Sequence, residues 1–209
     1  MLIELRPWED PSIIELGRED AHVAWGAYET GGQARACDRS ASKYVLDLSG
    51  EWAFKLYDAP GDVPCDIASV RGTVPIAVPG NFELQGHSKP IYTNTLYPWA
   101  YEGRQAIYPN EDGCPLPHPP FIPADNPTGI YLKTIDISEE LLSREAFIEF
   151  DGVEAAFCLW VNGAFAGFSQ DSKLPAAFNI TRLLQQGANH IALMVTRWSY
   201  STYLEDQDY

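Results

Sequence analysis

The sequence predicts an all-β protein, an antiparallel jelly-roll β-sandwich that carries an irregular N-terminal arm. Three observations support this fold class. First, short stretches alternate apolar and polar residues with a period of two, as in a half-buried strand. Second, these stretches are separated by Gly, Pro and Asn. Third, no long helical pattern alternates with them. Many short strands joined by tight turns are typical of sandwiches and barrels rather than of α/β folds.

The predicted arm comes first, because no apolar period is sustained over the first 42 residues. Large aromatic residues in this segment, among them Trp8 and Trp25, argue against disorder, since disordered segments are poor in aromatics. We therefore expect an arm over residues 1–42 that lies across a single sandwich domain over residues 43–209.

The predicted strands follow the arm. Trp52, Phe54 and Leu56 alternate with Ala, Lys and Tyr and define the first strand. Four more strands are predicted by β-branched or alternating stretches that end near turn residues, and they cover residues 72–78, 130–137, 146–150 and 189–197. In the last strand, Ile191, Leu193 and Val195 are expected on one face.

The strongest local signal is a β-hairpin. Two apolar stretches, 157–161 and 164–168, flank the dipeptide Asn162-Gly163. Asn-Gly supplies the positive φ angles that a type I′ turn requires. The sequence therefore predicts two paired strands at this point.

Two other segments lack the strand pattern. Residues 179–187 predict one or two helical turns that end at Gly187, because glycine tolerates the left-handed conformation at a helix end. Eight prolines between Tyr97 and Pro127 predict a long ordered loop, since proline cannot donate to a β-ladder. Long loops on rigid sandwiches often carry function. For residues 100–116, a surface insertion with no role in chemistry is an equally good interpretation.

The composition excludes two classes of partner. With 14 Lys and Arg against 29 Asp and Glu, the formal net charge is −15, which repels nucleic acids and anionic membranes. No apolar run approaches the ~18 residues of a membrane span, and the N-terminus has no secretory signal pattern. A soluble cytoplasmic protein is therefore expected.

Cysteines and histidines indicate no catalytic or zinc site. No Cys-x-x-Cys pair occurs, the four histidines are dispersed, and no G-x-S-x-G motif marks a serine nucleophile. Cys158 lies in an apolar run and is expected to be a small buried residue rather than a nucleophile. Free thiols are consistent with the cytoplasm.

Eight segments, taken in order, carry a family resemblance. They include Val-Pro-Gly-Asn, Ile-Tyr-Thr-Asn, Leu-Trp-Val-Asn-Gly and Leu-Glu-Asp-Gln-Asp, and they cover residues 48–54, 78–86, 90–94, 125–129, 150–153, 159–163, 167–172, and 197–199 with 203–208. Together they resemble the N-terminal sugar-binding domain of bacterial β-galactosidases of glycoside hydrolase family 2, whose fold is a jelly roll like that of galactose-binding domains.

The resemblance implies that the chain is the first domain of a longer multidomain hydrolase, and the abrupt end at Tyr209 also suggests a truncated chain. In that family two glutamates of a (β/α)₈ barrel are the acid/base and the nucleophile of a retaining mechanism. No catalytic residue is therefore expected in this chain, which should be inactive alone. Implied partners are β-galactosides such as lactose, the other domains, and further copies in a homo-oligomer.

The resemblance also assigns site residues. Asn94 falls where the family's asparagine contacts substrate, and an amide both donates to and accepts from a sugar hydroxyl. Asp208 falls at the aspartate that contacts galactose and Na⁺, with the other sodium ligands on the barrel. Without the resemblance, Asn94 would be a turn residue and Asp208 part of a solvated charge run.

A structural Mg²⁺ near the arm is the second ion that the resemblance implies. Gln170 matches one of its ligands. The family's aspartates at two other ligand positions are Pro7 and Tyr200 here, and Asp10 replaces an asparagine. Mg²⁺ requires near-complete octahedral oxygen coordination, so the sequence leaves the existence of this site open.

Two alternatives to an enzyme domain remain at this stage. A free-standing carbohydrate-binding module would use some of the six Trp and eleven Tyr to stack on sugar rings. Most of these aromatics, including Trp52 and Trp160, are nevertheless expected in the core. An assembly module would use the arm to reach a neighbouring subunit.

Overall fold

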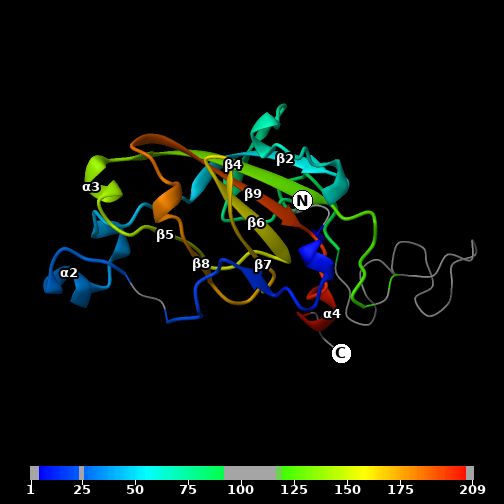
Figure 1. Ribbon diagram of the computed structural model, residues 1–209, viewed down its shortest axis with the longest axis horizontal. Helices are drawn as coiled ribbons and strands as arrows, with labels where there is room; N and C mark the ends of the chain where they lie inside the picture. Colours follow the sequence, from blue (N-terminus) through cyan, green and yellow to red (C-terminus); the bar gives the residue numbers. More distant parts are fainter. Residues whose placement is uncertain (1–4, 24–25, 92–116, 118, 206–209) are drawn as a thin grey trace, which may run out of the picture.

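The protein is a sandwich of two antiparallel sheets in the computed structural model, which describes residues 5–23, 26–91, 117 and 119–205 (Figure 1). The large sheet contains, in spatial order, β1 (Glu15–Leu16), β7 (Ala164–Ser169), β6 (Ala156–Val161), β9 (Gly187–Thr196), β4 (Thr128–Ile137), β2 (Gly50–Tyr57) and β3 (Val74–Val78). The small sheet pairs β5 (Phe147–Phe150) with β8 (Ala176–Asn179). The predicted all-β class is confirmed.

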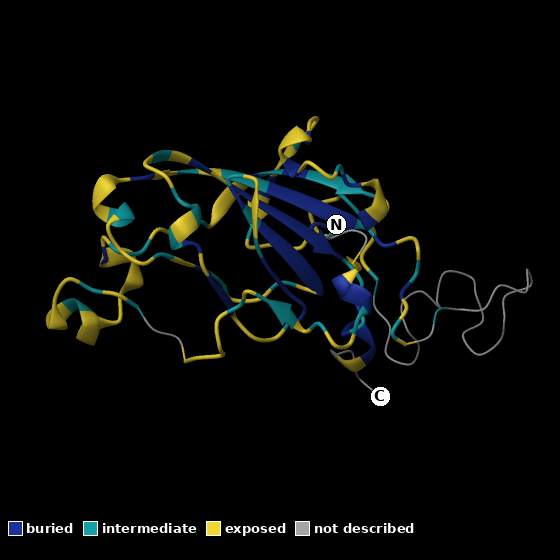
Figure 2. Cartoon of the chain, in the orientation of Figure 1, coloured by how far each residue is buried: buried dark blue, intermediate teal, exposed yellow. Residues whose placement is uncertain are grey.

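The centre of the large sheet is the pair β4 and β9. Their ten residues pair without interruption from Thr128↔Thr196 to Ile137↔Gly187. In β9, Ile191, Leu193 and Val195 face the small sheet as predicted, while Ala192 and Met194 are buried on the opposite face. This strand is therefore covered on both sides, as its nearly continuous apolar sequence requires (Figure 2).

The first core lies between the two sheets. Phe157 of β6 packs edge-on against Phe150 of β5 and Phe178 of β8, with ring centroids 5.0 and 5.8 Å apart. Aromatic pairs prefer this geometry because the positive ring edge meets the negative ring face. The two layers are thus held together by rings from both sheets.

The second core covers the other face of the large sheet. Buried side chains of the sheet there, such as Ile130, Cys158 and Phe168, pack with residues from outside the strands. These come from the arm, from the segment 63–70 around the 3₁₀ helix Ile67–Ser69, from the 119–127 loop and from α4 (Thr202–Glu205). They are Trp8, Val63, Ile67, Val70, Ile122 and Tyr203. Trp8 is only 2% exposed, so the start of the arm is part of the core.

The predicted hairpin is confirmed. Asn162 and Gly163 have φ angles of 52° and 79°, as a type I′ turn requires, and they join β6 to β7. The Asn162 carboxamide also donates to the Leu183 carbonyl and the Asn189 Oδ1, both at 2.8 Å. The turn is thereby tied to the start of β9.

The helical turn predicted over 179–187 is shorter than expected. Only Thr181–Leu183 forms a 3₁₀ helix, and Gly187, with φ of 82°, begins β9 instead of ending a helix. The reason is the buried carboxamide of Asn189, which accepts from the Gln185 amide and donates to the Gln185 carbonyl. These bonds hold the chain in a loop before the strand begins.

Among the strands and α-helices of the described residues, five were not predicted. They are the strands β1 and β8 and the helices α2 (Gly31–Ala36), α3 (Glu139–Leu142) and α4. A capping box between Thr30 and Gln33 starts α2, which buries none of its residues. Trp160, expected in the core, is only half-buried: it packs on the edge of the second core and edge-on against Phe165.

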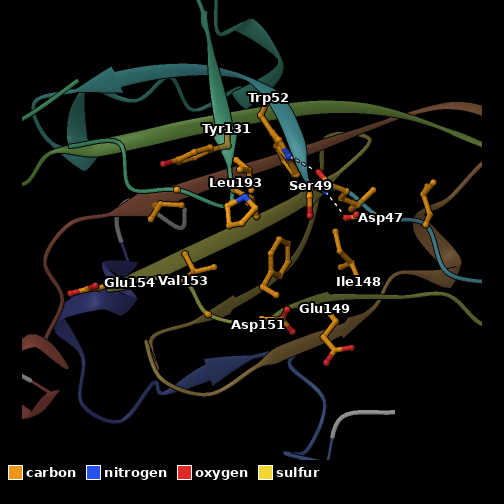
Figure 3. A pocket seen from close by; sticks show the side chains of 18 of the residues that line it. Asp47, Ser49, Trp52, Tyr131, Ile148, Glu149, Asp151, Val153, Glu154 and Leu193 are labelled. Atoms are coloured by element: carbon orange, nitrogen blue, oxygen red, sulfur yellow. Dashed lines mark hydrogen bonds between the residues drawn. The ribbon is translucent and has the colours of Figure 1, made fainter. Parts of the chain in front are cut away.

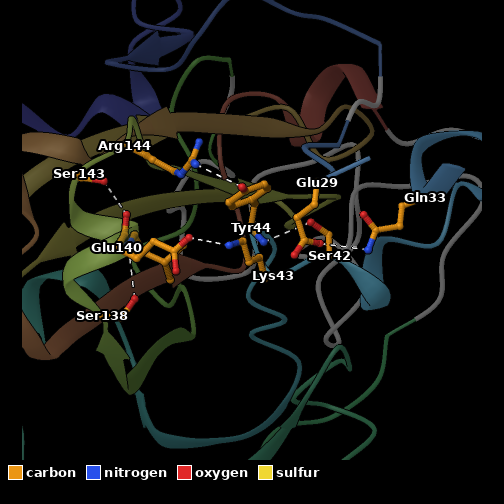
Figure 4. A network of polar contacts seen from close by, with 10 residues as sticks. Glu29, Gln33, Ser42, Lys43, Tyr44, Ser138, Glu140, Ser143 and Arg144 are labelled. Atoms are coloured by element: carbon orange, nitrogen blue, oxygen red, sulfur yellow. Dashed lines mark hydrogen bonds and ion pairs between the residues drawn. The ribbon is translucent and has the colours of Figure 1, made fainter. Parts of the chain in front are cut away.

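Polar contacts fasten the end of the arm, and Lys43 and Tyr44 directly after it, to other parts of the sandwich (Figure 4). Lys43 Nζ lies 2.7 Å from Glu140 Oε1 of α3, and Arg144 donates to the Tyr44 hydroxyl while stacking on its ring. Arg39 pairs with Glu149 of β5 at 3.1 Å. These pairs are largely exposed, so each contributes little free energy alone.

Candidate functional site

A cleft of about 2020 Å³ lies between the two layers and is the candidate functional site (Figure 3). Trp52, Tyr131 and Leu193 form its wall on the large sheet, and Ile148 and Val153 form the opposite wall. Carboxylates also line the cleft, namely Asp47, Glu83, Glu149, Asp151 and Glu154. The cleft thus combines an apolar interior with acidic groups.

The aromatic side chains of this cleft are held by the protein itself. Trp52 is 3% exposed, its Nε1 donates to the Leu48 carbonyl at 2.8 Å, and Lys133 Nζ lies 5.4 Å from its ring centroid. Tyr131 packs edge-on against Phe54. Neither ring presents an open face on which a sugar could stack.

Two ionisable groups in the cleft have shifted pKa values. Burial, with a smaller contribution from the Glu83 charge, raises the pKa of the Tyr131 hydroxyl well above its usual range, so that it stays protonated. Hydrogen bonds from Ser49 lower the pKa of Asp47. The cleft therefore contains both a neutral phenol and an ionised carboxylate.

Arg197 also lines the cleft. Its Nε lies 3.4 Å from Glu83 Oε1, its Nη1 donates to the Ser88 hydroxyl at 3.2 Å, and its Nη2 donates to the Lys89 carbonyl at 3.0 Å. Its guanidinium also lies over the Trp198 ring, 4.9 Å from the centroid. One side chain thus joins the residues after β9 to segment 83–89.

The segment after β9 is fixed by buried polar contacts. The carboxamide of Asn126, 1% exposed, accepts from the Trp198 amide at 2.8 Å and donates to the Trp198 carbonyl at 3.0 Å. Tyr203 of α4 donates its hydroxyl to the Phe121 carbonyl at 2.5 Å. Because both the NH₂ group and the oxygen of this buried carboxamide are paired, the residues bonded to it are held in one arrangement.

Asn94 and Asp208 both lie outside the described residues. The described residues that precede them are Ile91, which lines the cleft, and the end of α4 at Glu205. Arg197 fastens segment 83–89 to the residue that follows β9, and Trp198 and Thr202 also line the cleft.

Gln170, the third predicted site residue, lies on the other side of the large sheet. It follows β7, is 3% exposed, and its Nε2 donates to the Ile13 carbonyl of the arm at 2.7 Å. Among the described residues, no group of three or more His, Cys, Asp or Glu side chains could hold a metal ion.

Cys158 is buried as predicted. It is 0% exposed in the second core, and burial raises its pKa to about 12. A thiol in this state is a poor nucleophile because the thiolate is the reactive form.

Within the described chain, no helix is both long enough and apolar enough to cross a membrane.

Comparison with known proteins decides the family. The sequence profile described as glycosyl hydrolases family 2, sugar binding domain, matches residues 45–209. The chain belongs to glycoside hydrolase family 2. Within this family it is similar to a curated β-galactosidase of Psychromonas ingrahamii, with 38% identity over 211 residues that cover 99% of this chain and 19% of the relative. The chain thus spans about a fifth of that family 2 enzyme.

The fold agrees with solved structures of other glycosidases. A β-glucuronidase of Faecalibacterium prausnitzii superimposes with a TM-score of 0.50 at 16% identity, over 72% of this chain and 20% of that protein. At this identity the likeness concerns the fold alone. It supports the sandwich as the domain architecture of this family 2 chain.

Sequence reasoning did not assign roles to Glu83, Asn126 and Arg197, although all three lie in segments that carry the resemblance. Local spacing gives no sign of their partners, because Arg197 and Ser88 are 109 positions apart. The available signal for Arg197 was its charge. It directly follows the last apolar strand, in a stretch with few other charged residues.

Proposed function

We propose that this chain is the first domain of a β-galactosidase and supplies one wall of its galactose pocket. The observation that carries the proposal is the Arg197 contact, which holds segment 83–89 against the residues that follow β9 at the edge of the cleft. The 38% identity to a β-galactosidase supports the choice of substrate. The identity extends over nearly the whole chain.

In this proposal the chain's residues bind and orient the sugar. The Asn94 amide donates to and accepts from galactose hydroxyls, and the Asp208 carboxylate accepts from another. Asp208 also contributes a hard oxygen ligand to Na⁺, whose remaining ligands come from the barrel. Orientation of the sugar lowers the barrier because less freedom is lost at the transition state.

The chemistry itself belongs to residues outside this chain. A retaining glycosidase needs two carboxyl groups about 5–5.5 Å apart. We place this pair on two glutamates of a barrel domain and propose that the chain alone is inactive. The exposed free thiols of Cys37 and Cys65 support a reducing compartment such as the cytoplasm as the site of action.

Variants of the full-length enzyme test the role of the two residues. Asn94→Ala and Asp208→Asn should each lower kcat/KM on a chromogenic β-galactoside by roughly tenfold to a hundredfold, since a contact to a charged group contributes about 1.5–3 kcal/mol. Asp208→Asn should also abolish the sodium dependence of the rate. Asp62→Asn, the same change at an exposed aspartate that does not line the cleft, is the matched control. Unchanged kinetics in both site variants would refute the proposal.

A free-standing carbohydrate-binding module is the weaker alternative, because the rings of Trp52 and Tyr131 in the cleft are buried. Titration of the chain with galactose or lactose separates the two. A half-built pocket should bind very weakly, whereas tight binding by the isolated chain would favour the module.

A further inference from the structure

The first half of the arm is bound to the sandwich by main-chain contacts. Strand β1 adds to the edge of β7, with Glu15 opposite Ser169 and Leu16 opposite Phe168. Next to it, the Glu19 amide donates to the Ala177 carbonyl at 2.8 Å. The arm therefore continues the large sheet rather than lying loosely on it.

Gln170 makes the side-chain contact between this edge and the arm. Its Nε2 donates to the Ile13 carbonyl, so a main-chain acceptor of the arm is satisfied by a donor from the sandwich. Five residues earlier in the arm, the Trp8 carbonyl accepts from the Tyr200 amide at 2.6 Å. Gln170 and Trp8 are 3% and 2% exposed, and an unpaired group at such a buried position would cost about 1–3 kcal/mol.

The residues around Gln170 do not fit the Mg²⁺ site that the family resemblance implies. Pro7 offers no ligand, and the Tyr200 side chain is a phenol instead of a carboxylate. The amide nitrogen of Gln170, rather than its oxygen, faces the Ile13 carbonyl. Gln170 Oε1 is buried without a partner among the described residues, but one neutral oxygen is far short of octahedral coordination.

The carboxylates of this part of the arm have partners of their own. Glu9 Oε1 lies 2.8 Å from Arg6 Nη2 and accepts from the Ile122 amide at 3.3 Å. Asp10 accepts from the amide and hydroxyl of Ser12, and Arg18 pairs with a third carboxylate, that of residue 15. These acids are therefore held by groups of the chain and do not converge on Gln170.

We propose that Gln170 is a metal-free clamp that holds the arm on the sandwich. The amide N–H of Gln170 bonds the arm directly, without a bridging cation, and the arm remains docked whether or not Mg²⁺ is present. This inference is independent of the galactose pocket, because it concerns the opposite face of the large sheet.

Hydrogen exchange of this chain tests the clamp directly. The readout is deuterium uptake by a peptide that covers residues 13–19, measured in excess EDTA and in millimolar Mg²⁺. The clamp predicts equal protection in both solutions and equal melting temperatures. Protection that is lost in EDTA and restored by Mg²⁺ would overturn it, and this comparison needs only the wild-type chain.

A variant tests whether Gln170 makes the contact. Gln170→Leu removes the donor at similar volume and should speed exchange of residues 13–19 by roughly fivefold to tenfold, the effect of one lost hydrogen bond. Gln186→Leu, the same change at an exposed glutamine, should leave this exchange unaltered. Unchanged exchange in folded Gln170→Leu would overturn the clamp. If that variant does not fold, the EDTA and Mg²⁺ comparison in the wild type decides.

Discussion

The guanidinium of Arg197 and the carboxylate of Glu83 form an ion pair at 3.4 Å, with side chains only 11% and 16% exposed. The pair joins the residue that follows β9 to the segment that follows β3. Its low exposure distinguishes it from the exposed pair of Lys43 and Glu140, whose side chains are 48% and 58% exposed. Of the two, the Arg197 pair is the one expected to matter for stability and for the site.

Arg197→Lys should therefore weaken the link between these two segments. Lysine keeps the charge but cannot bond Glu83, Ser88 and the Lys89 carbonyl at once, because it lacks the planar fork of five donors. We expect a loss of about 1.5–3 kcal/mol in the free energy of unfolding of this chain, measured by urea denaturation. In the full-length enzyme we expect kcat/KM to fall by more than the loss of folded protein explains. We also expect kcat, measured at saturating substrate, to fall.

The control for this variant is Arg182→Lys, at an exposed arginine of the 3₁₀ helix Thr181–Leu183. It should leave both stability and kinetics within error of the wild type. Equal effects of the two substitutions would show that Arg197 has no special role.

Gly167→Ala should destabilise the edge of the sheet on which the arm docks. A Cβ at Gly167 would lie 2.3 Å from Cε1 of Phe178 and 2.7 Å from the Leu16 carbonyl oxygen. Such overpacking typically costs about 1–3 kcal/mol. Thermal unfolding should show a clear decrease in Tm, and exchange of the β1 amides should increase.

Gly61→Ala is the matched control for that substitution, because a Cβ at Gly61 meets no atom within 4 Å. Its Tm should match that of the wild type within about one degree, or rise slightly through the lower entropy of the unfolded chain. A Gly167→Ala protein as stable as Gly61→Ala would contradict the packing seen at β7.

The stability of the chain should fall as the pH rises above about 9. Burial raises the pKa of Cys158 from 9.0 to about 12, so between these values the unfolded state releases a proton that the folded state keeps. The unfolded state then binds fewer protons, and the free energy of unfolding falls by about 1.4 kcal/mol per pH unit from this group. Tyr131, whose pKa is also raised, adds to the loss at higher pH.

Urea denaturation of the wild type and of Cys158→Ala at a series of pH values measures this contribution. The variant should be less stable at neutral pH because a cavity replaces the thiol, but its stability should decline less steeply between pH 9 and 12. Parallel pH profiles for the two proteins would contradict the assignment.

Native alkylation should modify Cys37 and Cys65, which are exposed, and spare Cys158.

Local patterns account for most of the central strands. Asn162-Gly163 predicted its hairpin because the turn depends on two residues alone, and Ile191, Leu193 and Val195 identified a core face by alternation. Short elements without such patterns were missed. Strand β8 has only four residues, and its burial depends on the ring of Phe178 meeting strands from elsewhere in the chain.

The site was harder to predict than the fold because its contacts join distant segments. Arg197 meets Ser88 across 109 positions, and Gln170 meets Ile13 across 157. No spacing rule connects such residues, since only the sheet order brings them together. The capping box of Thr30 and Gln33, in contrast, was present in the sequence as a local signal for α2.

In the proposed division of labour, this domain binds part of the sugar and a barrel carries the catalytic glutamates. Hydrolysis of a chromogenic β-galactoside by the 209-residue chain and by the full-length product of its reading frame, measured side by side, tests it most directly. We predict hydrolysis by the longer protein alone, and a rate for the chain that equals the buffer blank. Hydrolysis by the purified chain would place a catalytic carboxylate pair within these residues and contradict the claim.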